Sequence, residues 1–128
     1  MDRIGDMLNM IKLGGNAKHP SVTVPHSKQK LAILECLLKA GYIAGVSVRT
    51  EKGFPVIDIA IRYENDAPRI HEVARISKPS RRMYSSAKDL RPFHGGHGSQ
   101  ILSTPKGILT DKEAKKQQVG GEILLSIW

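Results

Sequence analysis

The chain has 128 residues, enough for one large domain or two small lobes. It holds 20 lysines and arginines against 12 aspartates and glutamates, and a net charge of +8 in so short a chain indicates a polyanionic partner. A single cysteine, Cys36, excludes an intrachain disulfide. No apolar run approaches the ~18 residues of a membrane span, and the acidic N-terminus has no signal-peptide pattern, so we expect no membrane association.

The beginning of the chain predicts a helix followed by a strand. Apolar side chains recur every three or four positions in residues 2–13, as in a helix with one buried face. This stripe consists of Ile4, Met7, Leu8 and Ile11. We expect Gly14-Gly15 to end the helix. Val22 and Val24 then alternate with hydroxyl residues, which is the pattern of a half-buried strand.

A second helix follows. Ser27 suits the N-cap position of a helix that runs to about Ala40, and Gly41 suits its C-terminal end. Lys28 and Lys30 fall in the first turn, where the helix dipole disfavours cations. Two interpretations stay open for these lysines: contact with phosphate groups, or ordinary solvation.

Residues 45–50 and 55–63 predict a β-hairpin around Lys52-Gly53. The second strand alternates, with one face formed by Ile57, Ile59, Ile61 and Tyr63. Both helices can cover that face, which gives a helix-on-sheet α/β lobe over residues 1–65.

Most of the net charge lies in residues 75–91. This stretch has six basic residues and one acidic residue, and therefore carries +5 of the total +8. The bases are Arg75, Lys78, Arg81, Arg82, Lys88 and Arg91. Pro79 and its small polar neighbours favour an irregular path, which we expect to cross between two lobes. Such a run is a candidate phosphate-binding surface, with a solvated charged face as the ordinary alternative.

The stretch Ile-Leu-Ser-Thr-Pro-Lys-Gly at residues 101–107 predicts a strand that ends in a rigid tip, because Pro105 fixes the backbone there. The tip carries Ser103, Thr104 and Lys106. Since the residues before it are more polar, we expect the strand to begin near Ile101.

A short helix is expected directly after the tip, because Thr110 and Glu113 have the spacing of a capping box. A last apolar strand follows Gly120-Gly121. This strand–tip–helix–strand unit over residues 99–128 predicts a mostly-β C-terminal lobe with one short helix, over residues 66–128. The fold class expected for the whole chain is therefore α+β, in two small lobes.

Several motifs occur in order along the C-terminal half: Gly96-His97-Gly98, Ser103-Thr104-Pro105-Lys106-Gly107, Thr110-Asp111 and Gly120-Gly121-Glu122. With them, the chain resembles the family of small-subunit ribosomal protein eight. The family's Ser-x-Pro-Gly-x-Arg-x-Tyr segment is matched by Ser77, Pro79, Arg82 and Tyr84. Two departures are Ser80, where glycine is usual, and Pro105, where many relatives have serine.

The resemblance implies a structural constituent of the small ribosomal subunit, of bacterial or organellar type. It implies direct binding to an irregular helix in the central domain of the small-subunit rRNA, and a role in subunit assembly. The partners would be this rRNA and neighbouring ribosomal proteins, with the chain a monomer within the ribonucleoprotein. It implies no cofactor, and a cytoplasmic ribosome, with an organellar ribosome as the alternative.

Short hydroxyls suit RNA because they can approach its shallow minor groove, where 2′-hydroxyls and base edges are displayed. Lys106 could reach a neighbouring phosphate and Tyr84 could stack on a splayed base. Glu122 matches a family position close to the RNA, with a solvated strand-end carboxylate as the alternative. The predicted RNA-binding residues are Ser103, Thr104, Pro105, Lys106, Gly107, Tyr84, Arg82, Arg81, Lys78, Lys28, Lys30 and Glu122.

No catalytic set is recognisable by motif. His94 and His97 lack partners at metal-binding spacing, and the glycines around them lack the context of a nucleotide loop. The alternatives are a free RNA-binding regulator that acts on a messenger RNA hairpin, an enzyme that uses the glycine loop for a phosphate ligand, and a protein–protein module.

Overall fold

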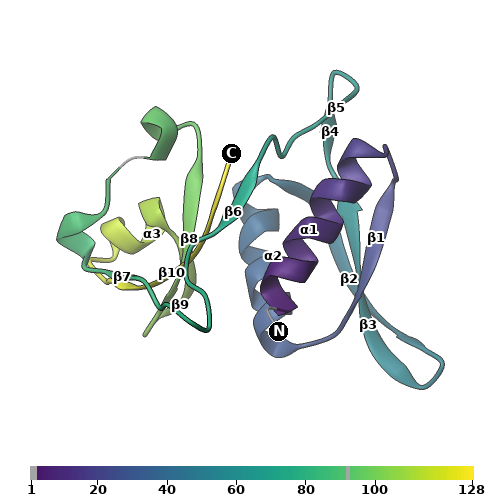
Figure 1. Cartoon of the computed structure of the whole chain (residues 1–128), viewed down its shortest axis with the longest axis horizontal. Coiled ribbons are helices and arrows are strands. Elements are labelled where there is room, and N and C mark those ends of the chain that lie inside the picture. The colour runs from purple at the N-terminus through teal and green to yellow at the C-terminus, as the bar shows by residue number, and fades with distance from the viewer. Residues whose placement is uncertain (1–2, 92) are drawn as a thin grey trace. The chain divides into compact units, whose positions relative to one another are not determined.

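The computed structural model describes residues 3–91 and 93–128, which form two compact units, Arg3–Ile70 (unit 1) and His71–Trp128 (unit 2) (Figure 1). Unit 1 combines two helices with a sheet, and unit 2 is mostly strand with one short α-helix, which confirms the α+β class. No helix in the described residues has the length and hydrophobicity needed to cross a membrane.

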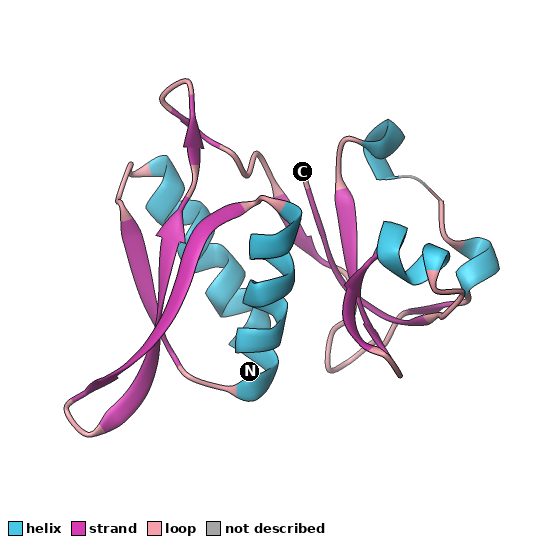
Figure 2. Ribbon diagram, turned by 180° about the vertical axis from the view of Figure 1, so that it is seen from behind, coloured by secondary structure: helices cyan, strands magenta, loops and turns pink. Residues whose placement is uncertain are grey.

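Unit 1 is built on an antiparallel sheet in the order β1 (Ser21–Pro25), β3 (Phe54–Ile61), β2 (Ile43–Glu51). The helices α1 (Arg3–Asn16) and α2 (Lys28–Ala40) lie on one side of this sheet (Figure 2). The predicted apolar faces form the core, since Met7, Leu34 and Ile59 are almost completely buried. A small ribbon of β4 (Tyr63–Glu64) and β5 (Ala67–Pro68) follows.

Local backbone chemistry in unit 1 confirms several predictions. The Ser27 hydroxyl accepts a hydrogen bond from the Lys30 amide (3.1 Å), and Gly41 ends α2 in the left-handed conformation. The β2–β3 hairpin turns on Lys52 and Gly53, both with positive φ, as a tight two-residue hairpin turn requires.

The prediction that Gly14-Gly15 ends α1 is wrong. The helix continues to Asn16, and the turn that follows it contains Lys18 with a φ of 58°. The glycines allow close packing instead, because a Cβ on Gly14 would lie 2.6 Å from Cγ1 of Val22 and one on Gly15 would lie 3.2 Å from Pro68.

Unit 2 is organised around β10 (Gly121–Ile127), which pairs antiparallel with β6 (Val73–Arg75), β7 (Tyr84–Ser85) and β8 (Ser99–Thr104). Strand β8 also pairs with β9 (Gly107–Thr110). The helix α3 (Asp111–Lys116) and the 3₁₀ turns η1 (Ala87–Asp89) and η2 (Phe93–Gly96) complete the unit. The Thr110–Glu113 capping box is present as predicted.

Three details of unit 2 differ from the expectations. A four-residue strand, β9, stands between the tip and α3, so the tip is the turn of a hairpin. Strand β8 begins at Ser99 instead of Ile101, because Ser99 is buried and pairs with Ile127. Residues 75–91 lie within unit 2 and do not connect the units. The residues at 88–92 also predict a short helical turn, and the structure has the 3₁₀ turn η1 at Ala87–Asp89, with Pro92 outside the described residues.

Candidate nucleic-acid interface

The predicted tip is the two-residue turn between β8 and β9, with Pro105 and Lys106 exposed at its centre. The Thr104 hydroxyl donates to the Gly107 carbonyl (2.8 Å) and accepts from the Lys106 amide (3.1 Å). Gly107 has a φ of 109°, which favours glycine. The turn is thus rigid, and the Thr104 hydroxyl has already used its only proton within it.

The sheet register brings together three predicted residues that are distant in the sequence. Glu122 lies directly opposite Ser103 on one side and Tyr84 on the other. Because residues directly opposite in antiparallel strands project from the same face, these three side chains share one face of the sheet. We call this set the reading row. Ser103 is half-buried and, among the described residues, its hydroxyl has no hydrogen-bond partner, whereas Tyr84 is 70% exposed.

Ser103 and Thr104 do not act from the same face. Successive residues of a strand project to opposite sides, so Thr104 points away from the row that contains Ser103. The motif predicted that the two hydroxyls act together, but only the Ser103 side chain lies on the same face as Glu122 and Tyr84.

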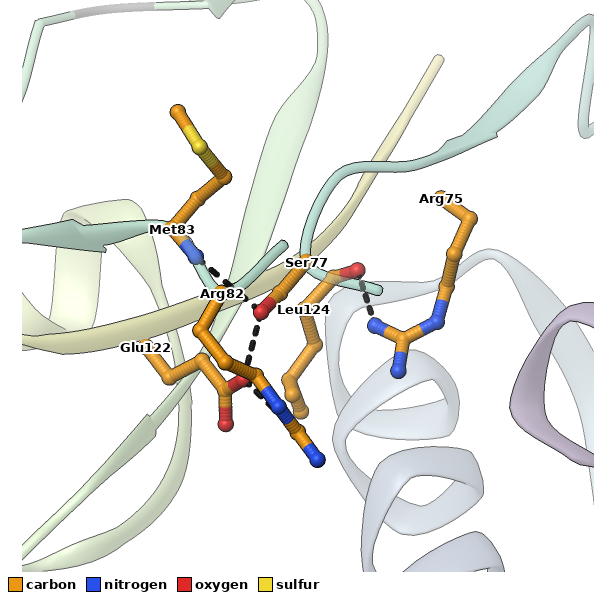
Figure 3. Close-up of polar contacts among 6 residues, drawn as sticks. All are labelled: Arg75, Ser77, Arg82, Met83, Glu122 and Leu124. Carbon is orange, nitrogen blue, oxygen red and sulfur yellow. Dashed lines mark hydrogen bonds and ion pairs between the residues drawn. The ribbon is translucent and has the colours of Figure 1, made fainter. Parts of the chain in front are cut away.

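Glu122 is the centre of a polar cluster (Figure 3). One oxygen of its carboxylate accepts hydrogen bonds from the Ser77 hydroxyl and from Nη1 of Arg82 (3.0 Å). Ser77 is fully buried and also accepts from the Met83 amide (3.2 Å). The cluster therefore fastens both ends of the loop from residue 77 to residue 83 to the central strand.

These contacts lower the pKa of Glu122. The hydrogen bond from Ser77 is the largest cause, and Arg82 adds to it, while burial opposes it. Glu122 is consequently an anion at neutral pH, compensated by Arg82 and by the field of Arg75. Figure 3 shows Arg75 directed at the Leu124 carbonyl, to which it donates a hydrogen bond.

Two glycines before Glu122 allow β10 to come this close to its neighbours. A Cβ on Gly121 would lie 2.0 Å from the Ser103 carbonyl oxygen, and one on Gly120 would lie 2.3 Å from the Ser85 carbonyl oxygen. Neither space can hold a side chain, since both obstacles are backbone atoms. The Gly-Gly-Glu motif thus places the carboxylate between Ser103 and Tyr84.

Basic residues surround the neighbouring loop. Lys78 and Arg81 exchange two backbone hydrogen bonds (2.9 and 3.0 Å) around Pro79-Ser80, and both side chains are exposed. Ser80 does not adopt a positive φ, so the missing glycine costs no backbone strain here. Arg82 follows directly and is held at Glu122.

The lysines of α2 differ from each other. Lys28 is exposed. Lys30 is only 7% exposed, and its ammonium donates to the Pro25 carbonyl (3.0 Å). Burial, with the nearby charge of Arg3, lowers the pKa of Lys30. Neither of the two interpretations of Lys30 as a surface cation fits this position, because its stem packs inside unit 1.

Sequence reasoning missed Ser77 as a functional residue and treated it only as part of a family motif. Its position before a proline-containing basic loop gave no signal of burial. Within the residues that the structure describes, no three histidine, cysteine, aspartate or glutamate side chains are grouped so that they could hold a metal ion.

Replacing Glu122 with glutamine should lower the free energy of unfolding at pH 7 by about 1–2 kcal/mol, because the charge-assisted bond from Arg82 is lost. A carboxyl group whose pKa is lowered in the folded state stabilises the fold at pH values above its usual pKa. This contribution disappears as the pH falls through the folded-state pKa. The deficit of Glu122→Gln should therefore shrink on acidification. Denaturant unfolding, followed by the fluorescence of Trp128, measures this.

The control for this experiment is Glu35→Gln, which makes the same substitution at an exposed glutamate of α2 and should change stability little at either pH. A Glu122→Gln deficit that stays constant between about pH 7 and about pH 3 would contradict the assigned role of the carboxylate.

Gly121→Ala should destabilise the chain by about 3 kcal/mol or more, because the new Cβ meets a backbone oxygen that can move only with β8. Gly45→Ala is the matched control, since that strand glycine has only an ordinary 3.6 Å contact with Ala60. We expect the control to change stability by about 0.5 kcal/mol or less in denaturant unfolding followed by circular dichroism. Equal losses in the two variants would refute the close-packing argument.

Comparisons with known proteins agree with the resemblance seen in the motifs. The family model of ribosomal protein S8 matches residues 2–128. The small ribosomal subunit protein uS8 of Dictyoglomus thermophilum is 46% identical over 127 residues, which are 99% of this chain and 97% of that protein. The uS8 proteins of Novosphingobium aromaticivorans (45% over 127 residues) and of Caulobacter sp. (43% over 128 residues) cover the same shares. A match of this extent identifies a ribosomal protein and not an enzyme, and the chain belongs to the ribosomal protein S8 family.

Proposed function

We propose that the chain is a constituent of the small ribosomal subunit that binds the central domain of the small-subunit rRNA through the reading row and the adjacent β8–β9 turn. By fixing this RNA it supports subunit assembly beside neighbouring ribosomal proteins. The observation that carries the proposal is the register that aligns Tyr84, Glu122 and Ser103 on one face.

Ser103 is the central reader in this proposal. Its hydroxyl can both donate to and accept from a 2′-hydroxyl or a base edge in the shallow minor groove. Thr104 can only accept from RNA, because its proton is bonded to Gly107. The rigid Pro105 turn lowers the ordering cost of binding.

The exposed lysine and arginine side chains attract RNA phosphates. Lys106 lies in the turn, and Lys78 and Arg81 flank the neighbouring loop. Tyr84 can stack on a base or a sugar, because 70% of its surface is exposed. Lys28 remains a proposed phosphate contact in unit 1, whereas the buried Lys30 is left out.

Glu122 acts in this proposal by positioning. Its charge is compensated by Arg82, so the carboxylate does not repel RNA as a free anion would. It holds the loop that carries Lys78 and Arg81, and its second oxygen can accept from a base amine.

Ser103→Ala should reduce the preference for a short hairpin from the central domain over a fully paired RNA by roughly threefold to tenfold, the value of one hydrogen bond. The hydroxyl of Ser47, exposed on β2, provides the matched control Ser47→Ala, which should leave the preference unchanged. Equilibrium binding of labelled RNA measures both. An unaltered preference in Ser103→Ala would remove Ser103 from the interface.

Lys78→Ala/Arg81→Ala should behave differently, because phosphate contacts carry no sequence information. We expect weaker binding of both RNAs and a salt dependence of log K reduced by about 1.5, with the preference retained. A salt series on the two RNAs tests this. A double variant that loses the preference but keeps the salt slope would contradict the anchoring role.

A further inference from the structure

Five exposed basic residues gather around α3 and η1, apart from the reading row. They are Lys88, Arg91, Lys112, Lys115 and Lys116. Two of them connect separate elements: the Lys115 ammonium donates to the Leu90 carbonyl (3.4 Å), and the Lys112 ammonium donates to the Gly96 carbonyl (2.9 Å). We call this set the α3 surface. These contacts restrain the long side chains of Lys112 and Lys115.

The α3 surface is hollowed. One hollow of about 690 Å³ is lined by Ser86, Ala87, Lys88, Lys115 and Gln118. A smaller hollow of about 80 Å³ shares Lys115 with it and is also lined by Leu90, Arg91, Asp111 and Lys112. Basic side chains thus contribute to the lining of both hollows.

The acids of the same elements are engaged within the protein. Asp111 is only 4% exposed, and its carboxylate accepts from the Gln100 amide. Glu113 accepts from the Thr110 amide in the capping box, and Asp89 accepts from the Ser86 hydroxyl. Apart from the exposed Asp89 and the half-buried Glu113, the charged side chains that the α3 surface presents to the solvent are basic.

The α3 surface and the reading row lie on opposite sides of the sheet. Helix α3 and the two 3₁₀ turns lie on one side of β8 and β10 in both views (Figures 1 and 2). There Ala114 packs with Leu90, Leu102 and Ile123 in the core of unit 2. Leu102 and Ile123 directly neighbour Ser103 and Glu122 in the sequence, so the two pairs project to opposite faces.

We propose that the α3 surface is a second RNA-binding surface, which takes the phosphate backbone of an RNA segment different from the one read by Ser103. Unit 2 would then join two RNA segments, one on each side of its sheet. This inference rests on the proposed function, because it presumes an RNA-rich surrounding.

The chemistry favours a nucleic-acid backbone over an acidic peptide. Four of the five charges are lysine ammonium groups, which bind phosphate as point charges without requiring a defined geometry. Lys88 and Lys115 line the larger hollow and Arg91 and Lys112 the smaller one, so the charges are spread over the surface and not gathered in one pocket, as suits a continuous polyanion. With no base-reading feature identified, the contact is expected to be independent of sequence.

The test begins with the chain saturated with the unlabelled central-domain hairpin, so that the reading row is occupied. A labelled, fully paired RNA duplex is then titrated into this complex. Lys88→Gln/Lys115→Gln is compared with Lys39→Gln/Lys52→Gln, an equal loss of charge at exposed lysines of unit 1. A polyglutamate peptide, titrated in the same way, provides the competing acidic partner.

We expect a complex that contains protein, hairpin and duplex, in which Lys88→Gln/Lys115→Gln weakens duplex binding at least about fivefold and lowers the salt slope by about 1.5. The hairpin affinity should be retained in this variant, and the control should bind the duplex like wild type. Equal duplex binding by the two double variants overturns the inference, as does tighter binding of polyglutamate than of the duplex. Absence of any hairpin preference in wild type would instead refute the proposed function.

Discussion

The close approach of β10 to β8 and β7 is the constraint on which unit 2 depends. Backbone oxygens of Ser103 and Ser85 occupy the space where side chains of Gly121 and Gly120 would stand. Only because these positions are glycines can this end of β10 lie between β8 and β7. The register that follows sets Glu122 between Ser103 and Tyr84, so the interface is a consequence of strand packing and not of a loop that finds its own conformation.

A carboxylate at the centre of the proposed RNA-binding surface requires compensation. Ser77 supplies a buried hydroxyl donor and Arg82 supplies both a donor and a positive charge. Burial of the carboxylate would by itself raise its pKa, yet the hydrogen bonds outweigh that cost and the pKa is lowered. The same bonds tie residues 77 and 82 to β10, so one carboxylate holds in place a loop that carries several basic side chains. The Glu122 carboxylate is therefore the source both of the negative charge that must be compensated and of the bonds that hold the loop.

Sequence patterns predicted those features that depend on neighbours along the chain. The Ser27 cap, the Lys52-Gly53 hairpin turn and the Thr110–Glu113 capping box each need only residues a few positions apart. The errors arose where distant packing decided the outcome. Gly14 resembles a helix stop, but its role is to admit Val22, and Lys30 resembles a surface cation, but Pro25 and the α1 side of unit 1 bury it. The family motifs contain most residues of the proposed interface, while the register that groups them required the folded sheet.

Side chains alternate between the two faces of a strand, and this explains how β8 and β10 can support the reading row on one face and α3 on the other. Ser103 and Glu122 project to one side of the sheet, and Leu102 and Ile123 project to the other, where they anchor α3. A residue proposed to read RNA and a residue that holds the basic helix are thus consecutive in the chain, and any shift of β8 by one position would exchange them. The glycines that fix the register of β10 consequently maintain both faces at once. The side chains of the reading row therefore keep their positions only as long as the core on the other face of the sheet is intact.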